Sequence, residues 1–520
     1  MIWQRLVIFI SFTKKYIENL KYQDILDKAR YSKMEAILIN QKTEQKHEKV
    51  VLVNPYPYYA IGINEATIYP PLGLAVIAAL LEKNNFKVQI IDANILRMMN
   101  DGVLRRIEEF GADIVGIQMN VVTARSGIEL SNMIKDKTPD TKVVIGGPFT
   151  PENLERLLKE TKADFFVQGE GEVTFLDICQ GKNPEDINGT VYLKDNQITF
   201  NRPRELIANL DDLPFAAYHL LPDLKLYRSR SRKAPMAPVF TSRGCPYQCV
   251  FCSSSSKKSP FQNRFRFRSA ENVVDEIEYL VKRFGIKQID ILDDNFTLYH
   301  DRADKILDLI IERKIKVAIN LQNGVRADKL TFGMVKKMKK AGVYKLGIGI
   351  ESGNTEVLKK MKKALDLKDV KNAVKWCREA GIICIGFFMI GFPFDTEETI
   401  KETIDFAIKL NPSIANFMTA VPLPGTELYD IVEKNGWLTK PTDEYGTSSG
   451  FYAQDFHYEI PHLPKEKILG LQKEAYRRFY FRPSKILEMA KDIRSFNELR
   501  WTVSAAKPLI KNMLSKIKPN

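Results

Sequence analysis

The stretch Arg243-Gly-Cys-Pro-Tyr-Gln-Cys-Val-Phe-Cys-Ser-Ser-Ser-Ser256 carries the strongest chemical signal in the chain. Its cysteines, Cys245, Cys249 and Cys252, stand four and three residues apart. Thiolate sulfur is a soft ligand that suits zinc or iron–sulfur clusters. A structural zinc site wants a fourth protein ligand, but no fourth cysteine completes a second pair and the closest downstream histidine is His300. Three thiolates on one short loop therefore favour a four-iron cluster with one iron left open, over a zinc loop or incidental core thiols.

The bulk composition indicates a soluble globular protein of two to four domains. Hydrophobic residues make up 44% and charged residues 27% of the 520-residue chain, which are ordinary values. Six cysteines in so long a chain do not form a secreted disulfide framework and suit a reducing compartment. The net charge of +14 is spread along the chain. We expect a solvated basic surface, with anionic lipid, nucleic acid or an acidic electron donor as alternative partners.

The N-terminus is apolar over residues 2–12, but Gln4 and Arg5 interrupt it. A membrane span needs about 20 apolar residues, and no small-residue cleavage site follows. We therefore expect a cytoplasmic protein. A helix that lies on a membrane surface is the alternative, and the basic, amphipathic tail that ends at Asn520 allows the same peripheral contact.

Predicted strands alternate with predicted helices from residue 50 to about residue 180. Buried-strand runs occur at 50–53, 88–91, 114–118, 142–145 and 164–167. This alternation predicts a parallel, doubly wound α/β sheet, whose ligands bind beyond the carboxyl ends of its strands. Polar and glycine residues follow those ends, among them Asn54, Gln118, Thr123, Gly146 and Gly147. The glycine pair lets the backbone approach a large ligand closely, although a tight strand–helix turn explains it equally well.

A second alternation begins near residue 238, after a connector that contains a predicted hairpin at 190–193 and 197–200. Six strand–helix units follow and predict a partial (βα)6 barrel, whose site lies at the carboxyl ends of the strands. Ser269 is the predicted N-cap of its first long helix and Gly342 the predicted C-cap of a later one. The expected strands span 239–242, 288–292, 316–321, 345–350, 382–390 and 414–421.

The cysteine loop resembles that of the radical S-adenosylmethionine (SAM) enzymes, in which an aromatic residue precedes the last cysteine, as Phe251 does here. The resemblance implies that the three cysteines hold a [4Fe–4S] cluster, that its open iron binds SAM, and that one electron cleaves SAM to methionine and a 5′-deoxyadenosyl radical. It also implies that Glu351 hydrogen-bonds the SAM ribose, and that Gly391 and Phe251 lie beside the adenine. A helix N-cap partner is the alternative for Glu351.

Asp293 and Asp294 form a carboxylate pair at a predicted strand end, where the same resemblance places the methionine part of SAM or the substrate. We expect them to be catalytic, with helix capping as the alternative. Arg243 either neutralises the cluster or a carboxylate, or forms an ordinary salt bridge. The alternating aromatic–basic stretch Phe261–Arg268 could stack nucleic-acid bases, but an exposed strand or a loop over the cluster explains it better. The three remaining cysteines are expected to be core residues: Cys179, Cys377 and Cys384.

Three motifs of the first sheet resemble the cobalamin-binding domain that precedes many radical SAM barrels. They are Tyr69-Pro-Pro-Leu-Gly-Leu-Ala75, Gly146-Gly-Pro-Phe-Thr150 and Gly169-Glu-Gly-Glu-Val-Thr-Phe175. The resemblance implies that cobalamin binds at Asn54, Gln118, Thr123, Gly146 and Gly147. Free-standing cobalamin domains place a histidine under the cobalt, but this chain has no histidine between Val50 and Asp140. Asn54, Gln118 and Asn120 are the polar candidates near that face.

These features divide the chain into five parts. The expected parts are an N-terminal extension (1–48), a Rossmann-like cobalamin-binding domain (49–180), a connector (181–236), a radical SAM partial barrel (237–440) and a mostly helical C-terminal region (441–520).

The combined resemblance implies a cobalamin-dependent radical SAM enzyme, in the class that holds hopanoid methylases and the anaerobic magnesium-protoporphyrin cyclase. We expect methyl transfer to an unactivated carbon or a phosphinate of a small-molecule or lipid substrate. A flavodoxin or ferredoxin is the expected electron donor, and nucleic acid is not an expected partner. Oxidation or cyclisation without methyl transfer is the first alternative, and a non-enzymatic cobalamin or redox sensor is the second.

Overall fold

The computed structural model describes residues 48–58, 68–120, 122–148, 151–195, 197–227, 232–255, 264–439 and 456–492. The N-terminal extension, the basic tail beyond residue 492 and the first three residues of the aromatic–basic stretch lie outside the described residues. Within the described part of the chain, no helix is both long enough and apolar enough to cross a membrane.

The first sheet has seven strands in the order β2-β1-β3-β4-β5-β6-β7. The first five strands of the chain are parallel, and β6 and β7 form an antiparallel hairpin at one edge. The predicted doubly wound sheet and hairpin are both confirmed. The strands are β1 (Lys49–Asn54), β2 (Lys87–Asp92), β3 (Ile114–Gln118), β4 (Lys142–Gly146), β5 (Phe165–Val167), β6 (Thr190–Lys194) and β7 (Gln197–Phe200).

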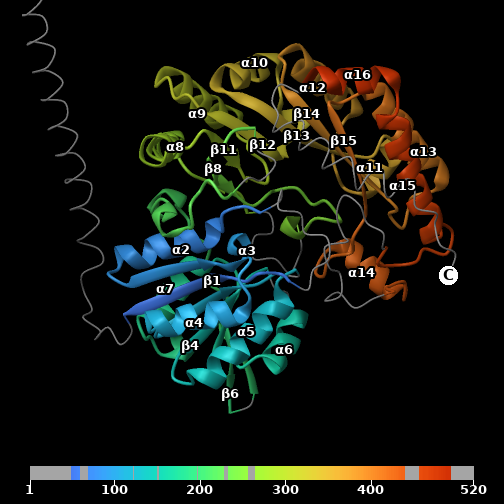
Figure 1. The fold of residues 1–520 in the computed structure, drawn as a ribbon. Helices are drawn as coiled ribbons and strands as arrows, with labels where there is room; N and C mark the ends of the chain where they lie inside the picture. The colour runs from blue at the N-terminus through green and yellow to red at the C-terminus, as the bar shows by residue number, and fades with distance from the viewer. Residues whose placement is uncertain are drawn as a thin grey trace, which may run out of the picture. The chain divides into compact units, whose positions relative to one another are not determined.

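Helices cover both faces of this sheet (Figure 1). Successive residues of β1 alternate between the two cores, since Leu52 packs in one apolar cluster and Val51 and Val53 pack in the other. One face carries α2 (Leu72–Lys83) and α7 (Gly171–Cys179). The other face carries α4 (Asn100–Phe110), α5 (Ala124–Lys137) and α6 (Pro151–Glu160); the one-turn helix α3 (Ala93–Leu96) follows β2.

The second sheet has six parallel strands in the order β15-β14-β13-β12-β11-β8, so that neighbours in the sheet are also neighbours in sequence. This order is that of a partial barrel, and it confirms the six predicted units. The strands are β8 (Met236–Val239), β11 (Gln288–Ile291), β12 (Ala318–Val325), β13 (Val343–Glu351), β14 (Ile383–Ile390) and β15 (Ile414–Thr419). A two-residue strand, β9 (Ser242–Arg243), continues β8 and pairs with β10 (Arg266–Phe267).

The barrel helices lie on the outer side of the sheet, as Figure 1 shows. Ser269 accepts a hydrogen bond from Asn272 N at the start of α8, and Gly342 ends α10 in the left-handed region at φ 106°, so both predicted caps are confirmed. The helices are α8 (Ala270–Phe284), α9 (His300–Glu312), α10 (Phe332–Ala341), α11 (Thr355–Lys360), α12 (Leu367–Glu379), α13 (Glu397–Leu410), α14 (Glu427–Lys434), α15 (Lys465–Tyr480) and α16 (Pro483–Asp492).

One apolar cluster runs from the α2–α7 face of the first sheet into the outer core of the barrel. The connector bridges them, because Leu210, Tyr218 and Tyr227 are buried in this same cluster. Tyr218 also donates a hydrogen bond to the Pro238 carbonyl of β8. The α2–α7 face of the first sheet and the helical face of the barrel therefore share one core, while the other face of the first sheet has a separate core.

Gly342 gives a direct test of the barrel packing. A Cβ atom there would lie 2.3 Å from the Val317 carbonyl oxygen in a left-handed backbone conformation. We predict that Gly342→Ala lowers the free energy of unfolding by about 1–3 kcal/mol. Gly333→Ala is the matched control in the same helix: it meets nothing within 4 Å and should raise stability slightly by helix propensity. Urea unfolding measures both, and equal effects of the two variants would contradict the packing described.

Candidate functional site

The cysteine loop follows β9 at the carboxyl edge of the barrel. Cys249 is buried and Cys245 and Cys252 are partly exposed, and all three are free thiols. The loop is braced on two sides, because Val250 N donates to the Met361 carbonyl (3.1 Å) and Leu428 N donates to the Val250 carbonyl (2.9 Å). This bracing fixes the backbone that carries the thiols.

Two cations stand near the thiols. The Arg326 guanidinium lies 3.7 Å from the centroid of the Tyr247 ring and donates to the Ala364 carbonyl (2.6 Å). Burial raises the pKa of Cys249 to about 11, while the Lys363 ammonium acts in the opposite direction. Cys249 is therefore a protonated thiol at neutral pH unless further positive charge arrives, and bound iron supplies that charge.

The three thiols of the loop match the number of cysteine ligands of a four-iron cluster with one open iron. Among the described residues, no three His, Cys, Asp or Glu side chains gather tightly enough to hold one metal ion. A four-iron cluster instead uses each cysteine for a separate iron.

The other three cysteines were predicted to be core residues. This prediction is confirmed, since Cys179, Cys377 and Cys384 are buried.

Glu351 ends β13 beside this loop and is held by an ion pair. Its carboxylate accepts a hydrogen bond from Lys363 Nζ at 2.8 Å, and both side chains are at most 10% exposed. Its φ of 65° is unusual for a residue with a side chain and is typical of functional sites. The capping alternative is wrong, because Asn354 caps α11 by accepting from Val357 N. Glu351 thus presents a carboxylate fixed by Lys363.

Gly391 follows β14 in a turn that reaches Phe251. The turn is held by Asp395, whose carboxylate accepts from Gly391 N and Phe392 N, both at 2.9 Å. The Phe392 ring meets the Phe251 ring edge-on at 5.7 Å between centroids. The fold therefore brings together Phe251 and Gly391, two residues predicted to bind SAM.

The two predicted catalytic aspartates differ in environment. Asp293 is buried and its carboxylate is occupied, since it accepts from the backbone N–H and hydroxyl groups of both Thr241 and Ser242. It braces the backbone that leads into the cysteine loop. Asp294 has an exposed side chain that accepts from Ser254 Oγ at 3.1 Å. Restricted solvation and the charge of Asp293 raise the Asp294 pKa. The Asp293 carboxylate is therefore engaged within the chain, whereas the Asp294 side chain is exposed.

A groove of about 330 Å³ lies at the carboxyl edge of the first sheet and includes three of the predicted cobalamin residues: Gln118, Gly146 and Gly147. Gln118 Oε1 is buried without a hydrogen-bond partner. A Cβ atom built on Gly146 meets nothing within 4 Å. An unsatisfied acceptor beside glycine-bordered space fits a large ligand with amide groups, such as cobalamin.

The other two predicted cobalamin residues have internal roles. Asn54 Nδ2 donates to the buried Asp92 carboxylate at 2.8 Å, and Tyr227 donates to the same carboxylate at 2.6 Å. Burial raises the pKa of Asp92. Thr123 Oγ1 accepts from Asn120 N at 3.0 Å and closes a turn before α5. Asn54 and Thr123 therefore support the groove's edge and do not line it.

The turn Gly169–Glu172 connects the groove to the cysteine loop. Gly169 and Gly171 line the groove, whereas the two glutamates turn away and bind arginines. Arg243, two residues before Cys245, donates to Glu170 (2.7 Å) and Glu172 (2.6 Å). Arg266 forms two hydrogen bonds to Glu170, at 2.8 and 2.9 Å. The strict alternation of glycine and glutamate is the signal that could have predicted this link.

The same network settles two alternatives from the sequence. Burial would raise the pKa of Glu170, but hydrogen bonds from Arg266 and Arg243 outweigh it and lower the pKa. Arg243 therefore forms salt bridges, which was one of the interpretations of this residue from the sequence. The described part of the aromatic–basic stretch, residues 264–268, includes the two-residue strand β10, in which Arg266 joins this network and Phe267 is exposed.

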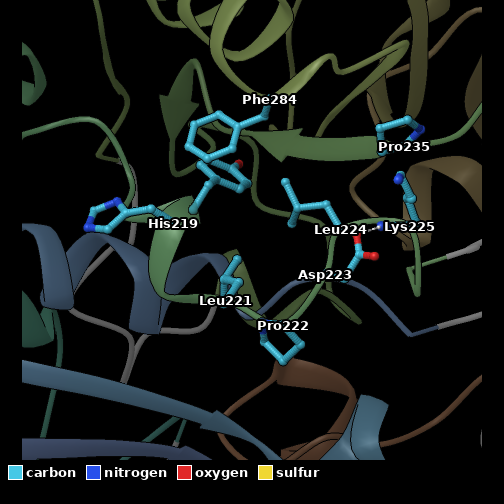
Figure 2. Close-up of a pocket in the computed structure, with 9 residues that line it drawn as sticks. His219, Leu221, Pro222, Asp223, Leu224, Lys225, Pro235 and Phe284 are labelled. Atoms are coloured by element: carbon cyan, nitrogen blue, oxygen red, sulfur yellow. Dashed lines mark hydrogen bonds between the residues drawn. The ribbon is translucent and has the colours of Figure 1, made fainter.

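A smaller hollow of about 250 Å³ lies among connector residues, near the amino end of β8 (Figure 2). Pro235 and Phe284 border it from the barrel side, and the His219 imidazole there faces Glu82 at 3.0 Å. The cysteine loop follows the carboxyl end of the same strand. This hollow is therefore separate from the site formed by the loop and the groove.

Comparison with known proteins agrees with this geometry. Residues 239–407 match the family model of the radical SAM superfamily, and residues 59–178 match that of the B12 binding domain. The chain is 33% identical to an uncharacterized methyltransferase of Pyrococcus horikoshii over 446 residues, which cover 85% of this chain and 94% of the relative. The chain belongs to the cobalamin-binding radical SAM enzymes.

Other relatives in this family differ in reaction. The cytidylyl-2-hydroxyethylphosphonate methyltransferase of Streptomyces wedmorensis is 28% identical over 77% of this chain and 84% of its own length. The anaerobic magnesium-protoporphyrin IX monomethyl ester cyclase of Rubrivivax gelatinosus is 26% identical over 73% of this chain and 69% of its own length.

A solved structure confirms the fold class of this radical SAM enzyme. The radical SAM methyltransferase TsrM of Kitasatospora setae, with cobalamin and a [4Fe–4S] cluster bound, superposes with a TM-score of 0.66 at 18% identity. The match covers 90% of this chain and 99% of TsrM. The predicted order of a Rossmann-like domain, a partial barrel and a helical C-terminal region is thereby confirmed as the fold class.

Asp395 predicts a pH dependence of stability. Burial raises its pKa to about 6 from an ordinary 3.8. The folded protein therefore holds a proton that the unfolded chain releases, and this contribution to stability is lost as pH rises from about 4 through about 6. Relative to the wild type, the free energy of unfolding of Asp395→Asn should rise by about 2.5 kcal/mol between pH 4 and pH 7. Urea unfolding at both pH values measures it, and a pH-independent difference would contradict the assignment.

The link between groove and loop predicts a large stability effect. Glu170→Gln removes a negative charge that both Arg243 and Arg266 contact. The free energy of unfolding should fall by about 3 kcal/mol. Glu356→Gln is the matched control, since its pair with Lys359 is exposed and should contribute nothing measurable. If urea unfolding shows equal effects for both variants, Glu170 does not hold the arginines as described.

Proposed function

We propose that this enzyme cleaves SAM at a [4Fe–4S] cluster and transfers a methyl group, with cobalamin as carrier, to an unactivated carbon or a phosphinate of a small-molecule or lipid substrate. The observation that carries the proposal is the turn Gly169–Glu172, which borders the groove of the first sheet and also binds Arg243 beside the cysteine loop. One chain thus couples a groove that carries predicted cobalamin-binding residues to a cysteine loop.

The residues would divide the work as follows. Cys245, Cys249 and Cys252 would each hold one iron. Glu351, fixed by Lys363, would accept hydrogen bonds from the two ribose hydroxyls of SAM. Phe251 and the Gly391 backbone would pack on the adenine. When bound, the cluster supplies the electron that cleaves SAM, and cobalamin supplies a carrier from which a methyl group leaves readily.

The groove residues would hold cobalamin without a protein imidazole below the cobalt. Gln118 would hydrogen-bond the ligand through its unpartnered Oε1, and Gly146 and Gly147 would let the backbone approach it. Asn54 and Thr123 would support this edge. Asp294 would donate or accept a proton at the substrate, and Asp293 would act only by holding the loop's backbone.

Partners and location follow from charge and chemistry. A low-potential donor such as flavodoxin or ferredoxin would reduce the cluster, and an acidic donor suits a chain with net charge +14. We propose a cytoplasmic enzyme, with peripheral membrane contact through its basic ends if the substrate is a lipid.

The second candidate function is oxidation or cyclisation without methyl transfer, which the similarity to the magnesium-protoporphyrin cyclase favours. SAM with a deuterated methyl group distinguishes the two. Methyl transfer predicts a product heavier by the labelled methyl group when the enzyme, a reductant and an extract of the source cells are combined. A turned-over substrate without label would reject methyl transfer and leave SAM cleavage intact.

The cysteine assignment makes a separate prediction. Cys249→Ala should lose most of the cluster iron, because one iron loses its only protein ligand. The rate of 5′-deoxyadenosine formation should fall at least about a hundredfold. Cys179→Ala, in the core of the first sheet, should keep both. Iron assay and chromatography of SAM products after anaerobic reconstitution measure them. Full iron in Cys249→Ala would exclude this residue as a ligand.

A further inference from the structure

Three aromatic side chains form a cluster that reaches the surface of the barrel. The ring centroids of Phe265, Phe267 and Tyr299 lie 6.1, 5.4 and 5.1 Å apart in the three possible pairs. Phe267 is 42% and Tyr299 is 52% exposed, and Phe265 is partly exposed. Single exposed apolar side chains are ordinary, whereas a contiguous group of them indicates a binding surface. These three residues are called the aromatic patch below.

The aromatic patch is tied to both ends of the cysteine loop. Phe267 on β10 is the register partner of Ser242 on β9, three residues before Cys245. Paired strands are about 5 Å apart and three residues span at most about 11 Å, so the Cα atoms of Phe267 and Cys245 are at most about 16 Å apart. The tyrosine of the patch stands five residues after Asp294, which accepts from Ser254 beyond the last cysteine of the loop. The patch therefore lies beside the predicted cluster.

The basic residues that alternate with the phenylalanines are engaged inside the protein. Arg266 forms an ion pair with Glu170, and Arg268 forms a buried ion pair with Glu276. A surface that stacks nucleic-acid bases on aromatic rings also needs basic side chains that follow the phosphate backbone. Here the charges are already used, so the alternation gives an apolar outer side and a charged inner side. This arrangement favours a protein partner over nucleic acid.

The surroundings of the aromatic patch are positive. The Arg302 guanidinium lies 5.3 Å from the centroid of the Phe267 ring. It donates to two backbone carbonyl groups, so no carboxylate of the described residues neutralises it by direct contact. The segment 256–264, which leads into the patch, contains three basic residues and no acidic one. Asp301, exposed at the start of α9, is the opposing charge. The balance favours an acidic partner.

The size of the aromatic patch limits the kind of partner. A stable protein–protein interface buries about 800 Å² on each partner, which three partly exposed side chains do not provide. Transient electron-transfer encounters use the smallest interfaces, and aromatic residues contribute strongly to binding at such surfaces. The proposed reaction also needs an electron delivered to the cysteine loop. The patch therefore suits a transient redox partner better than a second copy of this chain.

We propose that the aromatic patch is the docking surface for a small acidic flavoprotein that reduces the cluster, with the exposed edge of its flavin against Phe267 and Tyr299. This proposal rests on the proposed function. A flavin ring is flat and aromatic and stacks on such side chains, whereas the iron–sulfur centre of a ferredoxin presents no flat ring. One electron passes from the reduced flavin to the cluster; the flavin is oxidised and the cluster reduced by it, and no bond forms or breaks.

Binding of a flavodoxin to the reconstituted holoprotein tests this surface. Fluorescence anisotropy of dye-labelled flavodoxin gives the Kd, and stopped-flow absorbance gives the rate at which reduced flavodoxin reduces the cluster. The double variant Phe267→Ser/Tyr299→Ser should raise the Kd at least about tenfold, because two aromatic contacts are lost. Tyr299→Ser alone serves if the double variant does not fold. The rate of reduction by dithionite, which needs no docking surface, should stay unchanged.

The matched control is Phe200→Ser on β7, since that ring is 45% exposed in the first sheet. It should leave the Kd for flavodoxin unchanged. Arg264→Glu tests the charge of the surroundings: at low salt it should slow association with flavodoxin at least about threefold, and the difference should vanish at high salt. Unchanged flavodoxin binding in the patch variants, or an equal loss in the control, would overturn the docking surface.

Two further outcomes distinguish the partner and the reaction. A single-stranded oligonucleotide that displaces flavodoxin from the wild type and binds the patch variants poorly would assign the patch to nucleic acid and overturn the proposal. Unchanged flavodoxin binding together with normal label transfer from SAM under dithionite would reject only the docking surface. Weakened flavodoxin binding in the variants, with no label transfer by the wild type, would reject only the methyl-transfer proposal.

Discussion

The ion-pair network of Glu170 and Glu172 with Arg243 and Arg266 fixes the groove of the first sheet relative to the cysteine loop. It is well buried and balances two charges of each sign. Arg243 also lies 4.5 Å from the centroid of the Phe240 ring, which fixes its orientation. Removing one partner would strand an unpaired charge, so the turn that borders the groove cannot move without moving the strand that enters the cysteine loop.

A shared apolar core gives this network a rigid setting. The cluster that fills the α2–α7 face continues into the barrel's outer core through buried connector residues. Tyr69 crosses the same boundary on the inner side and binds Asp290. The groove and the cysteine loop therefore belong to one packed body.

Local sequence pattern predicted the elements and part of the site. Strand–helix alternation, Ser269 and Gly342 gave both sheets and two caps, because these signals act over a few residues. The cysteine spacing and the strand-end positions of Phe251, Glu351 and Gly391 were likewise visible. The sequence did not show which side chains pair between distant segments. Asn54 binds Asp92, Asp293 binds Thr241 and Ser242, and Lys363 binds Glu351. Only tertiary packing decides which polar residue is free for a ligand.

The central claim is that one chain holds cobalamin and the cluster against a common interior. Electron paramagnetic resonance of the holoprotein tests it, since Co(II) cobalamin and the reduced cluster each carry an unpaired spin. Reducing the cluster should shorten the relaxation time of the Co(II) signal or split it, because two unpaired spins that lie near one another couple magnetically. A Co(II) signal unchanged by cluster reduction, in protein with full corrin and iron content, would contradict the arrangement.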